Sequence, residues 1–241
     1  MRLIRSLAAM ALAFAPLHAA AQTVVSETVE VIDDDGGNDR AIFEGAPAVP
    51  QGVARFGPFR VLDGGRAALV DATSSDAPAQ FAAMLRAYPG IATLEMIECP
   101  GTYDDVANLQ LGRAIHARGL VTHVPAGGSV RSGAVELYLA GAVHRADPGA
   151  EFAVHSWEDD NGKQAVDFPA DAPVNRAYLD YYREMGMTAA TAARFYAMTN
   201  SVPNASARWL TAAEMDGWAG QNVPPASAAT LASLDSNAAL K

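Results

Sequence analysis

The chain has 241 residues, half of them apolar, and its 17 basic and 27 acidic residues give a formal net charge of −10. An acidic protein repels the phosphate backbone, so nucleic acid is not expected as a partner. Cys99 is the single cysteine, which excludes an intramolecular disulfide and favours a small buried side chain. The histidines show no metal-ligand spacing, so we expect neither a metal ion nor another cofactor.

Residues 1–21 have the pattern of a secretory signal peptide. Arg2 and Arg5 precede a short apolar stretch, and three alanines stand before Gln22, where cleavage is expected. Without the two leader arginines the chain has 15 basic and 27 acidic residues, a net charge of −12. No later apolar run reaches the roughly 18 residues of a membrane span. We therefore expect a periplasmic or secreted protein with no transmembrane segment after signal cleavage.

Three further regions follow the signal peptide. Residues 22–53 are irregular and contain an acidic, turn-rich run, which is typical of a solvated segment. Residues 54–223 are long enough, and contain enough apolar residues, to form one folded domain with its own hydrophobic core. Residues 224–241 begin with two prolines and are rich in alanine and serine, so we expect a disordered tail.

Within the domain, strands and helices alternate. The expected elements are, in order, a hairpin of strands 54–62 and 67–71 around Asp63-Gly64-Gly65, a helix 75–88, a strand 93–98, a helix from the Thr102-x-x-Asp105 signature to Gly119, a strand 121–124, a helix from Ser132 to about 140, a strand 151–154, helices 174–185 and 188–198, and a short helix 210–217. Such alternation predicts an α/β fold.

Four short motifs in this order resemble those of the Clp protease proteolytic subunit and the wider crotonase-like superfamily. They are Cys99-Pro100-Gly101-Thr102, Arg131-Ser132-Gly133-Ala134, the segment 140–145 (Ala-Gly-Ala-Val-His-Arg) and Ala153-Val154-His155. The resemblance covers roughly residues 61–220. It implies a ClpP/crotonase-like spiral of β-β-α units, a homo-oligomer, and a peptide or protein substrate.

The same resemblance implies a serine peptidase site. Ser132 would be the nucleophile and His155 its base, because a serine hydroxyl is protonated at neutral pH and needs a neighbouring imidazole. The N–H of Gly133 and that of Gly101 or Thr102 would form the oxyanion hole. Thr102 stands where the family has a second glycine.

The third member of the family's triad, an aspartate just before the segment matched by residues 208–212, is absent here. Asn204 could orient the imidazole in its place, as asparagine does in some cysteine proteases. Asp167 or Asp171 could also substitute, or the pair could act without a third group.

Other interpretations remain open from the sequence. Ser129 is an alternative candidate for the nucleophile, but it precedes the expected helix by three residues, which favours a role in the turn. A Ser/Lys dyad would have to use Lys163, in a polar segment where solvation keeps an amine charged. A coenzyme A hydratase or isomerase lacks its glutamate at the matching turns. The alternative of another class is a catalytically inactive scaffold that binds a protein or peptide in the periplasm.

Overall fold

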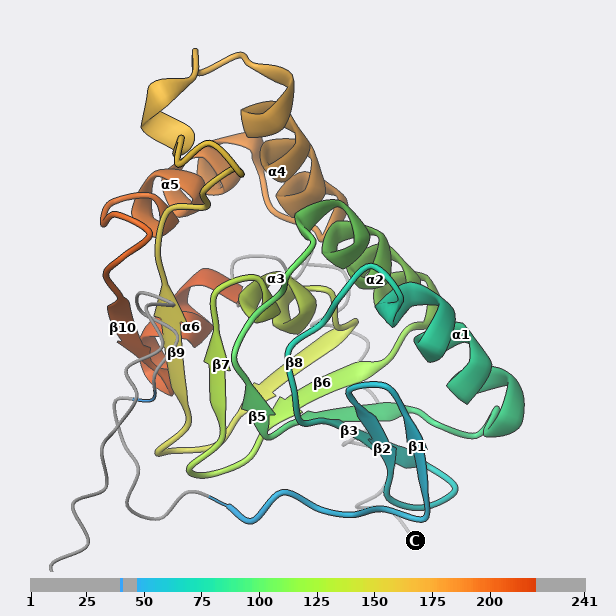
Figure 1. The fold of residues 1–241 in the computed structure, drawn as a ribbon. Coiled ribbons are helices and arrows are strands. Elements are labelled where there is room, and N and C mark those ends of the chain that lie inside the picture. The colour runs from blue at the N-terminus through green and yellow to red at the C-terminus, as the bar shows by residue number, and fades with distance from the viewer. Residues whose placement is uncertain (1–39, 41–46, 220–241) are drawn as a thin grey trace, which may run out of the picture. The chain divides into compact units, whose positions relative to one another are not determined.

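The computed structural model describes Arg40 and residues 47–219 (Figure 1). The elements of these residues are β1 (Ala54–Phe56), β2 (Phe59–Val61), β3 (Arg66–Leu69), α1 (Ala77–Ala87), β4 (Thr93–Met96), β5 (Glu98–Cys99), α2 (Asp105–Arg118), β6 (Val121–Val124), β7 (Ser129–Arg131), α3 (Ala134–Leu139), β8 (Val143–Ala146), β9 (Glu151–Val154), the 3-10 turn η1 (Ala165–Asp167), α4 (Pro173–Glu184), α5 (Ala189–Thr199), β10 (Arg208–Thr211) and α6 (Ala212–Ala219). The predicted α/β class is confirmed.

The described strands form two sheets, which the chain visits alternately. The larger has the order β1-β2-β3-β4-β6-β8 and the smaller the order β10-β9-β7-β5. Strand β4 joins the larger sheet and β5 the smaller, α2 follows, and β6, β7 and α3 repeat the sequence. Because β5, β7 and β9 pair in parallel, their carboxyl ends lie at one edge of the smaller sheet.

Apolar side chains from both sheets and from the helices make one main core. Fully buried members include Leu69, Leu94, Leu111, Tyr138 and Phe152. Cys99 is also fully buried, as predicted, and its thiol donates to the carbonyl oxygen of Leu69 at 3.4 Å. Burial raises the pKa of this thiol far above its usual range, so it is unreactive.

Most expected elements are confirmed, with five corrections. The predicted strand 93–98 is divided between β4 and β5, which belong to different sheets, and Ser129, expected in a turn, is the first residue of β7. The predicted strand 54–62 is divided into β1 and β2, because Gly57 takes a left-handed φ of 57° and Pro58 follows it. The cap of α2 is Asp104, whose carboxylate accepts from Ala107 N, and not Thr102. Residues 208–211 form strand β10 along β9, where a helix was expected from residue 210.

No helix within residues 47–219 is long and apolar enough to cross a bilayer. The predicted signal peptide 1–21, the segment 22–46 apart from Arg40, and the tail 224–241 lie outside the described residues. The domain boundaries at 54 and 223 stay predictions.

Candidate active site

Ser132 occupies the turn that joins β7 to α3. Its backbone has a φ of 49°, and it is the one residue other than glycine with a positive φ in the described part of the chain. Left-handed backbone is unfavourable for an L-residue and is kept where surrounding contacts enforce it. Here the Ser132 N–H donates to Ala153 O at 2.9 Å, and its carbonyl accepts from Val135 N at 3.0 Å. Strand β9 and the first turn of α3 thus hold the serine from both sides.

The turn after β5 lies directly against the Ser132 side chain. A Cβ added to Gly101 would lie 2.9 Å from Ser132 Cβ and 3.3 Å from Ser132 Oγ. Gly101 also has a φ of 134°, a conformation that favours glycine. Glycine is therefore needed here both for the shape of the turn and for the space beside the serine.

A second contact joins the same two turns through Thr102 and Gly133. A Cβ on Gly133 would lie 2.5 Å from Thr102 Cγ2. The buried Asn108 of α2 reinforces the contact, since its Nδ2 donates to Gly133 O at 2.6 Å and its Oδ1 accepts from Thr73 Oγ1 at 3.0 Å. Asn108 was missed at the sequence level, where it reads as one more polar residue of an amphipathic helix.

The main-chain N–H groups of Gly101, Thr102 and Gly133 make no hydrogen bond to any described residue. Free N–H groups on adjoining turns are what an oxyanion hole requires. The three predicted oxyanion residues therefore come from neighbouring turns with their donors available.

His155 follows β9, and its ring is held through one nitrogen. Nδ1 lies 2.9 Å from Ser156 O, and the Asn204 amide Nδ2 lies 3.1 Å from the same oxygen and 3.3 Å from Nδ1. We assign the proton to Nδ1, because a carbonyl oxygen can only accept. The other nitrogen, Nε2, then carries the lone pair, and it is buried with no hydrogen-bond partner among the described residues.

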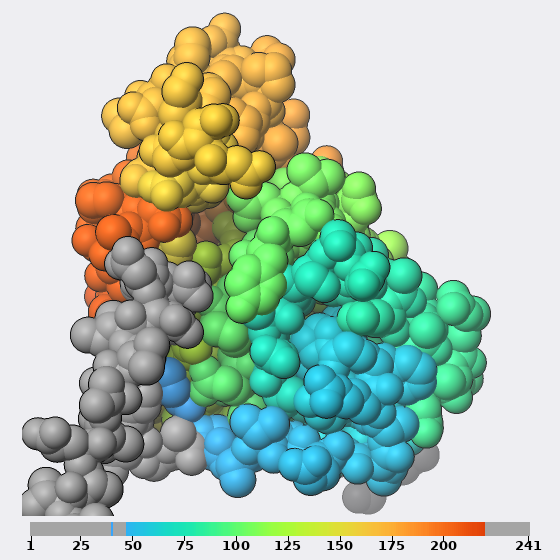
Figure 2. Space-filling view, viewed as in Figure 1, coloured from blue at the N-terminus to red at the C-terminus, as the bar shows by residue number. Residues whose placement is uncertain are grey.

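These residues surround one cavity of about 110 Å³. Its lining includes five of the six predicted site residues, namely Thr102, Ser132, Gly133, His155 and Asn204, while Gly101 contacts Ser132 from behind. Residues 157–172 and α4 stand out from the surface as a lobe, coloured yellow to orange (Figure 2). Trp157 and Glu158 of this lobe also line the cavity.

The other candidates considered from the sequence lie elsewhere. Lys163, Asp167 and Asp171 are not among the cavity residues. Lys163 Nζ lies over the ring of Phe168, and Asp167 caps η1 by accepting from Gln164 N. Ser129 is fully buried and donates to Glu151 Oε1 at 2.7 Å, so it is not available as a nucleophile.

Two carboxyl groups in the cavity were not anticipated. Burial raises the pKa of Glu136 to about 7, although the hydroxyl of Tyr182, which donates to its Oε1 at 2.6 Å, acts in the opposite direction. Burial also raises the pKa of Asp105, against a hydrogen bond from Tyr178 and the charge of His155. A signal was present for Glu136, the one charged residue in the otherwise apolar stretch 134–139, four residues after Ser132.

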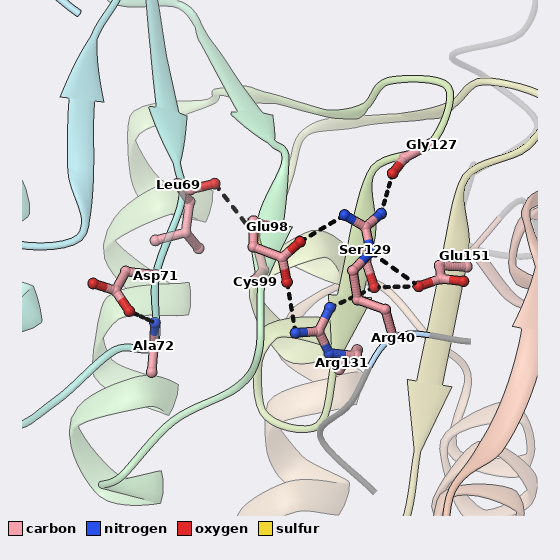
Figure 3. Close-up of polar contacts among 10 residues, drawn as sticks. All are labelled: Arg40, Leu69, Asp71, Ala72, Glu98, Cys99, Gly127, Ser129, Arg131 and Glu151. Carbon is pink, nitrogen blue, oxygen red and sulfur yellow. Dashed lines mark hydrogen bonds and ion pairs between the residues drawn. The ribbon is translucent and has the colours of Figure 1, made fainter. Parts of the chain in front are cut away.

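An ion-pair network joins β5, β7 and β9, the strands that lead to the site (Figure 3). Arg131, next to Ser132, contacts Glu98 at 2.6 Å and Ser129 Oγ at 2.6 Å. Arg40 contacts Glu98 at 2.7 Å and Glu151 at 3.6 Å, and it also donates to Gly127 O. The side chain of Arg40 is only 9% exposed, although the segment 22–53 was expected to be solvated.

No protein-family model matches the chain, and no curated protein matches it. Among solved structures, a mutant of the 1510-N membrane-bound stomatin-specific protease in complex with a substrate peptide is similar at 14% identity and a TM-score of 0.43, over 63% of this chain and 70% of that chain. The 1510-N membrane protease specific for a stomatin homolog from Pyrococcus horikoshii gives 14% identity and a TM-score of 0.41, over 63% and 68%. These values are too low to carry a functional argument, so we assign the site from the geometry of this chain.

Proposed function

We propose that the chain is an exported serine peptidase of the ClpP/crotonase-like type, with Ser132 as nucleophile and His155 as general base. The observation that carries the proposal is the shared cavity, which is lined by Ser132, on left-handed backbone, and by His155, whose Nε2 has no hydrogen-bond partner among the described residues. The succession β4-β5-α2 and β6-β7-α3 supports the proposed spiral of β-β-α units.

In this mechanism Ser132 Oγ attacks the peptide carbonyl carbon while Nε2 of His155 takes the hydroxyl proton. The N–H of Gly133 and that of Gly101 or Thr102 donate to the oxyanion that forms. Collapse of the tetrahedral intermediate breaks the C–N bond, and His155 gives its proton to the leaving amine. Water, activated by the same imidazole, then hydrolyses the acyl-enzyme.

The orienting role that an aspartate has in the usual triad passes to neutral groups. Ser156 O accepts from Nδ1–H of His155, which fixes the tautomer, and the Asn204 amide donates to that same oxygen and fixes the carbonyl. Neutral partners orient the ring but give little charge stabilisation to the imidazolium. Asp105, whose charge interacts with that of His155, supplies a carboxylate in the same cavity.

The alternative function is a binding scaffold that holds a peptide without cleaving it. It is favoured by the missing aspartate and by the absence of a hydrogen bond between Ser132 and the unpaired Nε2 in this structure. Catalytic hydrogen bonds are often long before substrate binds, so this geometry is compatible with either function.

Export to the periplasm or medium and assembly into a homo-oligomer are further parts of the proposal, and they rest on the sequence.

Digestion of a peptide mixture, with products identified by mass spectrometry, tests the proposal. The processed protein is expected to cleave peptides, and Ser132→Ala and His155→Ala are each expected to slow cleavage by about a thousandfold or more. Cleavage that persists in both folded variants would contradict the assignment. Saturable peptide binding without any cleavage would support the scaffold.

A further inference from the structure

Acidic side chains also line the cavity beside Ser132 and His155. Asp105, from the first turn of α2, and Glu136, from α3, both line it, and the three tyrosines Tyr178, Tyr182 and Tyr196 line it as well. Glu136 is 6% exposed and accepts from Tyr182 OH at 2.6 Å. Burial raises the pKa of Asp105, and Tyr178 acts in the opposite direction. We name Asp105 and Glu136 the carboxyl subsite.

The carboxyl subsite has no permanently charged cation among the residues that line the cavity. None of the residues that line the cavity is a lysine or an arginine. Buried carboxylates in proteins are normally paired with a cation or coordinate a metal, because an unpaired buried charge is costly. The described residues hold no cluster of three or more groups that could bind a metal ion. His155, which lines the same cavity, also has its Nε2 buried without a hydrogen-bond partner among the described residues.

A positively charged group would satisfy the subsite. It would donate to the two carboxyl groups and offset the raised pKa values that burial produces at both. Tyr182 OH donates to Glu136, which leaves its own oxygen free to accept from an ammonium or guanidinium group. The rings of Tyr178 and Tyr196 are stacked with centroids 5.8 Å apart, and aromatic faces suit both the alkyl part and the charge of such a side chain.

We propose that Asp105 and Glu136 form the specificity subsite for a lysine or arginine side chain of the substrate peptide, next to the bond that Ser132 attacks. The inference rests on the proposed peptidase function. It adds the substrate class, which is peptides with a basic residue at the cleaved bond. The alternative is that the two carboxyl groups are protonated structural acids held by tyrosines, and the experiment separates the two.

Two peptidyl diphenyl phosphonates that differ only in the residue next to phosphorus, lysine or norleucine, provide the test. Norleucine keeps the alkyl chain and lacks the ammonium group, so the ratio of the two inactivation rate constants isolates the charge. In the wild-type protein the lysine probe is expected to react about tenfold faster or more. Glu136→Gln and Asp105→Asn are each expected to bring the ratio of the two rate constants close to one, because each removes a negative charge that favours the lysine probe over the norleucine probe. Asp171→Asn, an exposed substitution outside the cavity, should leave the ratio as in wild type.

Glutamine at 136 can still accept from Tyr182, so this variant should fold, and Asp105→Asn serves if it does not. A ratio near one in the wild type, or a wild-type ratio in both variants, overturns the subsite and leaves the peptidase function standing. If neither probe reacts, the peptidase function fails, and binding of n-butylammonium is then compared with that of 1-butanol by NMR, which needs no catalysis. Preferential binding of n-butylammonium that Glu136→Gln abolishes supports the subsite, and equal or absent binding overturns it.

Discussion

At the scale of single residues, the site depends on a missing side chain. Ser132 can turn its Oγ toward the cavity because Gly101, on the neighbouring turn, has no Cβ. The left-handed φ of Ser132 and the φ of 134° at Gly101 occur in the two turns that touch. Strained backbone concentrated in this way is typical of functional sites.

Gly101→Ala is expected to damage the site and the fold together. The new methyl group would meet Ser132 Cβ at 2.9 Å on backbone that disfavours it, so we expect a loss of about 1 to 3 kcal/mol in the free energy of unfolding. Cleavage should fall by about tenfold or more, because the serine is displaced. Gly64→Ala is the control, since a Cβ there meets no atom within 4 Å. Equal urea midpoints and equal activity for the two variants would contradict this account of Gly101.

Glu136 should make stability depend on pH in a recognisable way. Its pKa is about 7 in the folded protein against 4.5 for a freely exposed glutamate, so the folded state holds the proton more tightly. The stability contributed by this proton is fully present below the unfolded pKa and is lost as pH rises through about 7. At 1.36 kcal/mol per pKa unit, the wild type should lose about 3 kcal/mol relative to Glu136→Gln between about pH 4 and about pH 8. Urea unfolding of both proteins at the two pH values measures this, and a constant difference would contradict it.

At the scale of elements, side-chain contacts join the three parallel strands that lead to the site. Glu98 of β5, Ser129 and Arg131 of β7, and Glu151 of β9 form one network with Arg40. Two arginines balance two glutamates in it. Arg40, which precedes the predicted domain, thus contributes its side chain to the network that joins these strands.

Arg40→Ala should destabilise the protein, because it leaves two glutamates facing a single arginine in a buried setting. We expect a loss of about 3 kcal/mol in the free energy of unfolding. Arg55→Ala removes an exposed arginine that donates to Gly57 O of its own turn, and it should change stability by less than about 0.5 kcal/mol. Chemical denaturation of both variants makes the comparison. If Arg40→Ala lowered the free energy of unfolding no more than Arg55→Ala does, the network would not contribute to stability.

Local signals explain which elements the sequence could predict. Helix α2 ends at Gly119, which takes the left-handed cap conformation with a φ of 71°. The predicted end of this helix is therefore confirmed. Strand β10 was not predicted because its four residues form a strand only through pairing with β9, which lies more than 50 positions earlier in the chain. Pairing at that distance leaves no local pattern to detect.

At the scale of the whole molecule, the site forms where the carboxyl ends of three parallel strands meet. Parallel pairing of β5, β7 and β9 in the register Cys99↔Val130 and Arg131↔Ala153 brings the turn at Gly101, Ser132 and His155 to one edge. The sequence motifs around Gly101, Ser132 and His155 had already identified the residues at this edge as candidates for the site. Asp105, Glu136 and Asn108 were missed, because their burial depends on how α2, α3 and α4 pack, which residue spacing does not encode.

The central claim is that Ser132 is an activated nucleophile, and the most direct measurement is to map the adduct of a fluorophosphonate probe on the purified, processed protein. We predict one adduct, on the tryptic peptide that begins at Ser132, which disappears in Ser132→Ala and in His155→Ala. Ser129 lies on a different tryptic peptide because Arg131 separates the two serines, so the assignment is unambiguous. An adduct on any other serine, or no adduct on folded protein, would contradict the claim.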